Sequence, residues 1–419
     1  MSYFRVTLGI LLLFLIGRYF YYNWIGKYFI NTIVYFPHFH WNFLKPLPEL
    51  YMYLVFGVLL VLAICITIGW KTRLSSLSFA IIFAYQHLID KSNFLNHYYL
   101  VFLLCIILTI VSDDESSNRV GVWKLYLIRF QLAVVYFFGA IAKIRPDWIL
   151  DAQPLKIWLL MNSDFPLIGS VLTWKFTAYF FSWAGLAFDA MIFPALLYKR
   201  TRKVAYFFVL LFHLLTSALF PIGMFPWIMI FLTPLCFSNR FHFEVLKKIQ
   251  VFAQRFKLDT SKKSKQSIVN IRSSIPKIVY IFVILQVVLP FRHFFFPGNM
   301  LWTEQGFRFS WHIMAAHKTG YIEFYLQEEN GNKFLVDYNH LLTERQLGQM
   351  RTEPGMIWQF AKEIETREKK KGRKNFGVYA NSFVSLNGKE ARRMIDPEVD
   401  LTKVEYNYFK HNSWITNFD

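Results

Sequence analysis

The sequence predicts an α-helical polytopic membrane protein, with about nine transmembrane helices followed by a C-terminal α+β extracytoplasmic domain. Hydrophobic residues make up 55% of the 419 residues and charged residues only 17%, whereas about a quarter of a soluble protein is charged. The apolar residues gather into runs close to the roughly 20 residues that a helix needs to cross a bilayer. From about residue 300 onward these runs give way to strand and turn patterns.

Nine apolar runs qualify as transmembrane helices. The first run is long and lacks the small-residue cleavage site of a signal peptide, so we expect a retained helix. The seventh and eighth runs are short, and a tight turn at Pro221 and Gly223 joins them. The predicted spans lie near residues 4–25, 50–70, 74–90, 96–112, 122–143, 172–198, 203–220, 222–238 and 277–297.

Lysine and arginine predict the orientation of these spans. With nine spans, every basic loop falls on one face, including the stretch from Arg240 to Lys277, and the positive-inside rule makes that face cytoplasmic. The N-terminus is then cytoplasmic, and everything after residue 297 is outside. This pattern also accounts for much of the formal net charge of +19. Nucleic-acid binding is not expected, because the basic stretch is not interleaved with stacking aromatic residues.

The residues from about 300 to 419 are predicted to form two hairpins with a charged helix between them. Asn330-Gly331 separates two strand patterns, which is a strong hairpin signal. A helix is expected from about Thr343 to Lys370, and a second hairpin turns at Asn387-Gly388. We therefore divide the chain into a transmembrane catalytic domain, residues 1–298, and an extracytoplasmic α+β domain, residues 299–419.

Four ionisable residues are predicted to converge near the outer leaflet: Lys143, His97, His213 and His293. Each has a structural interpretation, because a lysine at a helix end can snorkel to the headgroups and a histidine in a span can bond a neighbouring helix. Ionisable residues inside a membrane are nevertheless often functional. The convergence of four of them favours a functional site.

The sequence predicts no metal site. No two histidines stand four residues apart on a helix, and neither an H-E-x-x-H motif nor a cysteine cluster occurs. His38 and His40 form only a weak H-x-H motif. A G-x-S-x-G nucleophile motif is also absent. Cys65, Cys105 and Cys236 lie inside predicted spans, so no disulfide framework is implied.

Several segments together carry a family resemblance. The clearest is Q-L-A-V-V-Y-F-F-G-A-I-A-K-I-R-P-D-W at residues 131–148. Others are D-K-S-N-F-L-N-H-Y-Y-L at 90–100, S-W-A-G-L-A-F-D at 182–189 and F-H-L-L-T-S-A-L-F-P-I-G-M-F at 212–225. In order and spacing they resemble the vitamin K-dependent γ-glutamyl carboxylases, whose bacterial members are also called the HTTM family. The resemblance runs from about residue 40 to the C-terminus.

The resemblance implies an enzyme of the carbon–carbon lyase class in the bacterial inner membrane, with a periplasmic C-terminal domain. Such an enzyme oxidises reduced vitamin K or a menaquinol-type hydroquinone to its epoxide with dioxygen, and the resulting strong base allows carbon dioxide to carboxylate a protein glutamate. The isoprenoid quinol would come from the bilayer, and a glutamate-containing protein would come from the outer face.

The resemblance also implies roles for single residues. Lys143 is implied as the base that deprotonates the hydroquinone, with His97 beside it, and we expect a neutral His97 imidazole to hydrogen-bond the amine. A lysine acts as a base only in its neutral form, which an apolar setting favours. Ala142 replaces a second lysine of the animal enzymes, Thr216 a pocket asparagine and Phe307 a tyrosine. The implied cofactor-binding residues are Asn96, His213, Thr216, His293 and Phe307.

Two other functions stay open on the sequence. A quinol epoxidase would use the same site without a glutamyl substrate. A non-catalytic lipid-binding or transport protein would use the four ionisable residues structurally. Transport would be favoured by inverted repeats or paired broken helices, and the sequence shows neither.

Overall fold

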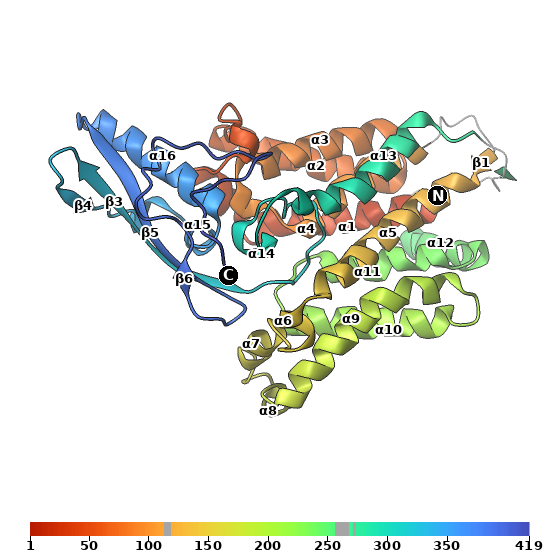
Figure 1. Ribbon diagram of the computed structural model, residues 1–419. Coiled ribbons are helices and arrows are strands. Elements are labelled where there is room, and N and C mark those ends of the chain that lie inside the picture. Colours follow the sequence, from red (N-terminus) through yellow and green to blue (C-terminus); the bar gives the residue numbers. More distant parts are fainter. Residues whose placement is uncertain (113–118, 256–267, 271–273, 419) are drawn as a thin grey trace.

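A computed structural model describes residues 1–112, 119–255, 268–270 and 274–418. Helices form one large part of the molecule, and a sheet with its own helices lies at one end of it (Figure 1). The N-terminus lies at the opposite end of the helical part, far from the sheet. The basic segment at 262–265, which the sequence places in a cytoplasmic loop, falls outside the described residues.

The helical part begins with four helices that pack in sequence order, α1 on α2, α2 on α3 and α3 on α4. Next comes α5, which packs against α9, and three short helices connect these two. The bounds are α1 Ser2–Tyr21, α2 Glu49–Ile68, α3 Thr72–Ile89, α4 Asn96–Val111, α5 Val122–Lys143, α6 Pro146–Ile149, α7 Leu155–Leu160, α8 Gly169–Leu172 and α9 Lys175–Leu197.

The remaining helices of this part follow α9. Helix α11 continues into a 3-10 turn, η4, and α13 continues into another, η5. A short parallel pair of strands, β1 and β2, lies far from the larger sheet. The bounds are α10 Arg202–Leu219, α11 Phe225–Leu232, η4 Thr233–Cys236, α12 Asn239–Arg255, α13 Lys277–Val288, η5 Leu289–Phe295, β1 Arg119–Gly121 and β2 Ile268–Asn270.

Six of the described helical segments are long and apolar enough to cross a membrane: α1, α2, α5, α9, α10 and α13 with η5. The other three predicted spans are also helical. Helix α3 is less apolar because it carries Arg73, Gln86 and His87, while α4 and the α11–η4 segment are shorter. The prediction of a helical membrane protein is therefore confirmed, with six spans recognisable by length and composition.

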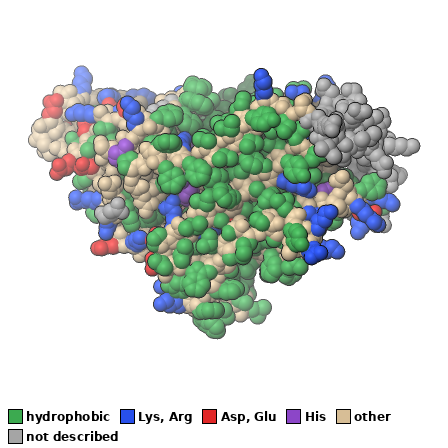
Figure 2. All heavy atoms as spheres, turned by 45° about the vertical axis from the view of Figure 1, so that its right-hand side comes forward, with side chains coloured by type: hydrophobic (Ala, Val, Ile, Leu, Met, Phe, Trp, Pro, Cys, Tyr) green, Lys and Arg blue, Asp and Glu red, His purple; other side chains and the backbone are tan. Residues whose placement is uncertain are grey.

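The surface of the helical part is strongly apolar. Figure 2 shows hydrophobic side chains over the broad middle of one face, while acidic side chains gather mainly at the end that carries the C-terminal domain. Large apolar side chains of α9, α10 and α13 are exposed, among them Phe176, Trp183, Phe207, Leu211 and Ile281. Such a surface needs a lipid environment.

The C-terminal domain contains a four-stranded antiparallel sheet in the order β4-β3-β5-β6. Both predicted hairpins are confirmed: β3 turns into β4 at Asn330-Gly331, and β5 turns toward β6 at Asn387-Gly388. Asn387, Gly331 and Gly388 have positive φ angles, as tight hairpin turns require. The strands are β3 Lys318–Glu328, β4 Lys333–Leu335, β5 Phe376–Leu386 and β6 Arg392–Arg393.

The prediction of one continuous helix from Thr343 to Lys370 is wrong. The structure has two helices, α15 Glu344–Met350 and α16 Pro354–Lys370. Glu353 has an extended backbone conformation directly before Pro354, because proline clashes with a helical residue in front of it. The break turns α16 so that its apolar side chains pack on the sheet.

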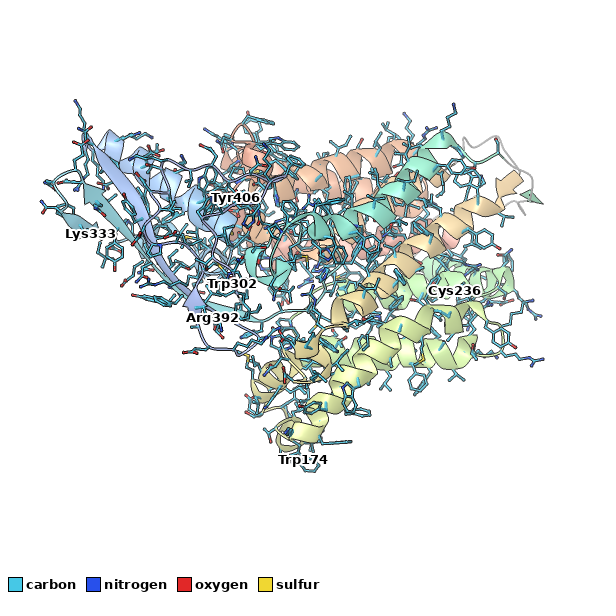
Figure 3. The ribbon with its side chains drawn as sticks, viewed as in Figure 1. Trp174, Cys236, Trp302, Lys333, Arg392 and Tyr406 are labelled. Atoms are coloured by element: carbon cyan, nitrogen blue, oxygen red, sulfur yellow. The ribbon has the colours of Figure 1, made fainter. Side chains whose placement is uncertain are left out.

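The C-terminal domain packs closely on one end of the helical part. Its apolar core, which includes the buried Trp302 (Figure 3), also takes in Val34, Phe36 and Ala142. Gln346 donates to Asp90 Oδ2 at 2.7 Å and to the Val34 carbonyl at 2.8 Å. Ala142 is therefore part of the domain interface, where the charge of a lysine would have to be buried.

Candidate functional site

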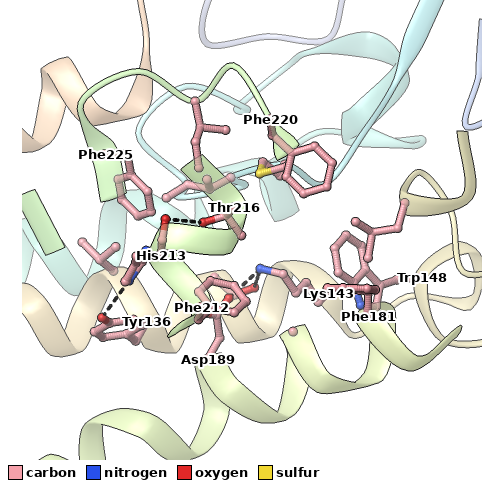
Figure 4. A pocket seen from close by; sticks show the side chains of 17 residues that line it. Tyr136, Lys143, Trp148, Phe181, Asp189, Phe212, His213, Thr216, Phe220 and Phe225 are labelled. Carbon is pink, nitrogen blue, oxygen red and sulfur yellow. Dashed lines mark hydrogen bonds and ion pairs between the residues drawn. The ribbon is translucent and has the colours of Figure 1, made fainter. Parts of the chain in front are cut away.

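Lys143, the last residue of α5, turns inward. Its side chain is only 8% exposed, and its Nζ donates to Asp189 Oδ2 at 2.6 Å and to the Gly139 carbonyl at 3.1 Å (Figure 4). The Trp148 ring lies 5.3 Å from the same nitrogen. A snorkelling lysine would extend to the headgroups, so this lysine instead belongs to a buried ion pair.

Close contact between α5 and α9 makes this pair possible. A Cβ atom on Gly139 would lie 3.1 Å from Asp189 Oδ2 and 3.9 Å from Lys143 Nζ. Glycine therefore leaves room for the carboxylate of α9 beside α5. Trp148 is fixed in turn by Ser182, because the indole Nε1 donates to the Ser182 carbonyl at 2.8 Å and the Ser182 hydroxyl donates to the Trp148 carbonyl.

The ion pair lies in the wall of a small cavity of about 70 Å³. The other walls are mostly aromatic and aliphatic and include Phe181, Phe212 and Phe220. Two predicted site residues, His213 and Thr216, line the same cavity from α10. The structure thus brings Lys143, His213 and Thr216 together (Figure 4).

His213 is oriented by a second buried polar group. Its Nε2 lies 3.1 Å from the Tyr136 hydroxyl, while its Nδ1 is buried and has no hydrogen-bond partner in the described part of the chain. Buried polar atoms are nearly always satisfied, so an orphaned one commonly indicates a missing water or ligand. A hydroxylated aromatic ring would suit both this nitrogen and the aromatic walls.

His97 and Asn96 lie elsewhere. They line a neighbouring cavity of about 520 Å³, together with Arg18 and Arg345. The two cavities share a wall of four apolar residues, Ile222, Phe225, Ile313 and Met314. The expectation that His97 hydrogen-bonds the Lys143 amine is therefore not met, because Asp189 and the Gly139 carbonyl are the partners of that amine.

His293 and Phe307 form a third group, centred on His312. The His312 ring lies 5.3 Å from the His293 ring and 6.1 Å from the Phe307 ring, centroid to centroid. Its Nε2 lies 3.3 Å from Arg145 Nη2. Burial and the charge of Arg145 lower the pKa of His312 to about 3, so this histidine is neutral. Neither His293 nor Phe307 lines the cavity beside Lys143, called the lysine cavity below.

Sequence reasoning missed Asp189, the closest partner of Lys143. The signal was present, because an acidic residue inside an apolar span is costly and is a functional candidate by default. Asp189 ends the segment at 182–189, which carries part of the family resemblance. The pairing itself depends on how α5 and α9 face each other, which no local pattern gives.

The arrangement suits proton transfer in an apolar site. A buried lysine and carboxylate can hold one proton between them, either as an ion pair or as a neutral pair, and an apolar setting reduces the preference for the charged form. Among the described residues, no group of three His, Cys, Asp or Glu side chains is placed to hold a metal ion.

Fold and site together define an integral membrane protein whose C-terminal domain packs over one end of the helices that enclose a buried lysine. Residues 1–241 match the HTTM domain, and residues 272–419 match the lumenal domain of the vitamin K-dependent gamma-carboxylase. The chain therefore belongs to the vitamin K-dependent gamma-carboxylase family. No solved structure matches the chain.

Proposed function

We propose that this protein couples the oxidation of a membrane quinol to the carboxylation of glutamate in a protein substrate. The observation that carries the proposal is the buried Lys143–Asp189 pair, 2.6 Å between Nζ and Oδ2, in the wall of an apolar cavity. Membership of the family suggests an enzyme that uses vitamin K hydroquinone. The aromatic walls and the unpartnered His213 Nδ1 suit such a ring.

In this proposal Lys143 is the base that takes a phenolic proton of the quinol. Unprotonated Lys143 takes the phenolic proton, leaving a quinolate, and the ammonium that results forms an ion pair with the Asp189 carboxylate, which stabilises it. His213 and Thr216 orient the ring from the opposite wall. When bound, the quinol would supply, with dioxygen, the strong base that removes a γ-proton from glutamate. The apolar walls exclude the water that would quench this base.

Asn96 and His97 act from the neighbouring cavity in this proposal. Asn96 and His97 approach the lysine cavity only across the shared wall of Ile222, Phe225, Ile313 and Met314. We propose that they contact the second substrate rather than Lys143. His293 and Phe307 support the site indirectly, through His312 and Arg145.

The proposed orientation has nine helical segments crossing the membrane, with α3, α4 and α11–η4 as its less apolar or shorter members. Two observations support it. The N-terminus and α12, which begins the basic stretch, lie far from the C-terminal domain (Figure 1), and the C-terminal domain is of the lumenal type. In a bacterium this arrangement places the C-terminal domain in the periplasm.

The test uses purified protein in lipid nanodiscs, supplied with reduced menaquinone, dioxygen and labelled bicarbonate. We expect quinone epoxide, together with label in a glutamate-containing peptide. Epoxide without label, at any peptide concentration, would support a quinol epoxidase instead. Absence of both products with reduced naphthoquinones and benzoquinones alike would contradict the proposal and favour a non-catalytic lipid-binding protein.

A further inference from the structure

The cavity beside the lysine cavity carries positive charge without compensation. Arg18 of α1 and Arg345 of α15 both line it, together with Asn96 and His97. None of its lining residues is acidic. Neither arginine forms an ion pair with any residue in the described ranges. Two half-buried guanidinium groups at one cavity without a carboxylate attract an anion.

Both guanidinium groups are held in place by aromatic rings. Arg18 Cζ lies 4.9 Å from the Trp24 ring centroid, and Arg345 Cζ lies 5.1 Å from the Tyr28 ring centroid. The Trp24 and Tyr28 rings are themselves 6.1 Å apart. The segment after α1 thus forms one aromatic platform for an arginine of the membrane helices and an arginine of the C-terminal domain. Stacked guanidinium groups retain donors for a ligand.

Arg345 is fixed further by its backbone contact. Its Nε donates to the Ser92 carbonyl at 2.8 Å, and its terminal amino groups make no hydrogen bond to a residue that the structure describes. The terminal amino groups of Arg345 therefore remain available to a ligand, and the Nε contact fixes the direction in which they point. Guanidinium groups bind carboxylates through paired, charge-assisted hydrogen bonds.

We propose that this cavity binds the carboxylate of the glutamyl substrate, with Arg18 and Arg345 as its specificity-determining residues. The inference rests on the proposed function and adds the site of the second substrate. The cavity volume of about 520 Å³ exceeds what one side chain fills, so residues that flank the glutamate can enter as well. The shared apolar wall brings the bound side chain next to the cavity in which the quinol reacts.

The experiment measures peptide binding without quinol, so it stays informative even if the quinol chemistry fails. The probe is a blocked tripeptide, Ala-Glu-Ala, and its matched control is Ala-Gln-Ala, both titrated into the full chain in phosphatidylcholine nanodiscs. We expect the glutamyl peptide to bind at least about tenfold more tightly, because a charge-assisted hydrogen bond contributes roughly one to two powers of ten in affinity.

Variants assign the effect to the two arginines. Arg18→Gln and Arg345→Gln should each weaken binding of the glutamyl peptide by about 10- to 100-fold, and Arg18→Lys and Arg345→Lys should restore part of it. Arg200→Gln, in the exposed turn between α9 and α10, is the matched control and should bind as the wild type does. Partial rescue by lysine separates lost charge from lost folding.

Three results would overturn the proposal. Equal affinity for the glutamyl and glutaminyl peptides would show that no carboxylate is recognised. Unchanged affinity in both glutamine variants would place the peptide elsewhere. Complete displacement of the peptide by phosphatidylglycerol in the nanodisc would identify the cavity as a site for a lipid phosphate.

Discussion

At the scale of single residues, the buried ammonium of Lys143 and its carboxylate partner distinguish this site from an ordinary helix end. The lysine is held by Asp189, by the Gly139 carbonyl and by the Trp148 ring. Removing one member of a buried pair usually costs about 3–5 kcal/mol, because the other charge is left uncompensated. The pair is therefore expected to contribute to both stability and reactivity.

Asp189→Asn tests the role of the carboxylate. Asparagine still accepts a hydrogen bond but cannot compensate the ammonium that forms when Lys143 takes a proton. We expect kcat for epoxide formation to fall by about 10²-fold or more, the usual size of acid–base effects, with little change in KM for the quinol. Asp151→Asn, at an exposed position before α7, is the control. A wild-type kcat in Asp189→Asn would restrict this residue to a structural role.

The variant His97→Ala distinguishes two roles for this histidine, positioning of Lys143 and contact with the glutamyl substrate. If His97 positioned Lys143, epoxidation without peptide would fall by about 10²- to 10⁴-fold. Its location in the neighbouring cavity predicts instead that glutamyl carboxylation falls far more than peptide-independent epoxidation. His340→Ala, at an exposed position of the C-terminal domain, should change neither rate. A parallel loss of both activities in His97→Ala would favour the positioning role.

At the scale of elements, the contact between α5 and α9 determines the geometry of the ion pair. Gly139→Val would place branched atoms where a single Cβ already lies 3.1 Å from Asp189 Oδ2. We expect this variant to separate the helices locally and to lower epoxidation at least about tenfold, because small displacements of catalytic groups have large effects. Gly57→Val in α2, with no atom within 4 Å of its new Cβ, should be active. Full activity of Gly139→Val would show that the pair tolerates displacement.

Most helices and both hairpins could be predicted because their signals are local. Apolar runs of membrane length and the Asn-Gly turns depend only on neighbouring residues. The break before Pro354 was equally local and was available from the same rules. The short helices α6, α7 and α8 were not predicted, because apolar residues show no clear helical periodicity in the segment after Trp148.

The site was predictable only in part, for a physical reason. Lys143, His213 and Thr216 do share a cavity, and the family motif pointed to them. Their partners depend on helix rotation and on which cavity each helix end faces. His97 lies at the start of α4 and Lys143 at the end of α5, yet an apolar wall separates their cavities. The position of a residue in the sequence shows that it lies at the end of a helix. It does not show which cavity its side chain faces.

At the scale of the whole molecule, the proposed orientation places the C-terminal domain and both cavities on the outer side. A periplasm-active reporter fused after Asp419 should therefore give signal in a bacterial host. The same reporter inserted at residues 262–265 should be silent, because that basic segment is expected to stay in the cytoplasm. The opposite pattern of signals would contradict the orientation and the nine-span count.

The most direct test of the central claim is quinone epoxide formation by Lys143→Arg compared with the wild type, measured in the same nanodiscs with reduced menaquinone and dioxygen. Arginine keeps a positive charge for Asp189 but does not release its proton, so it cannot act as the base. We predict epoxide from the wild type and from the control Lys156→Arg, an exposed lysine of α7, and none above background from Lys143→Arg. Equal epoxide formation by Lys143→Arg and the wild type would contradict the account.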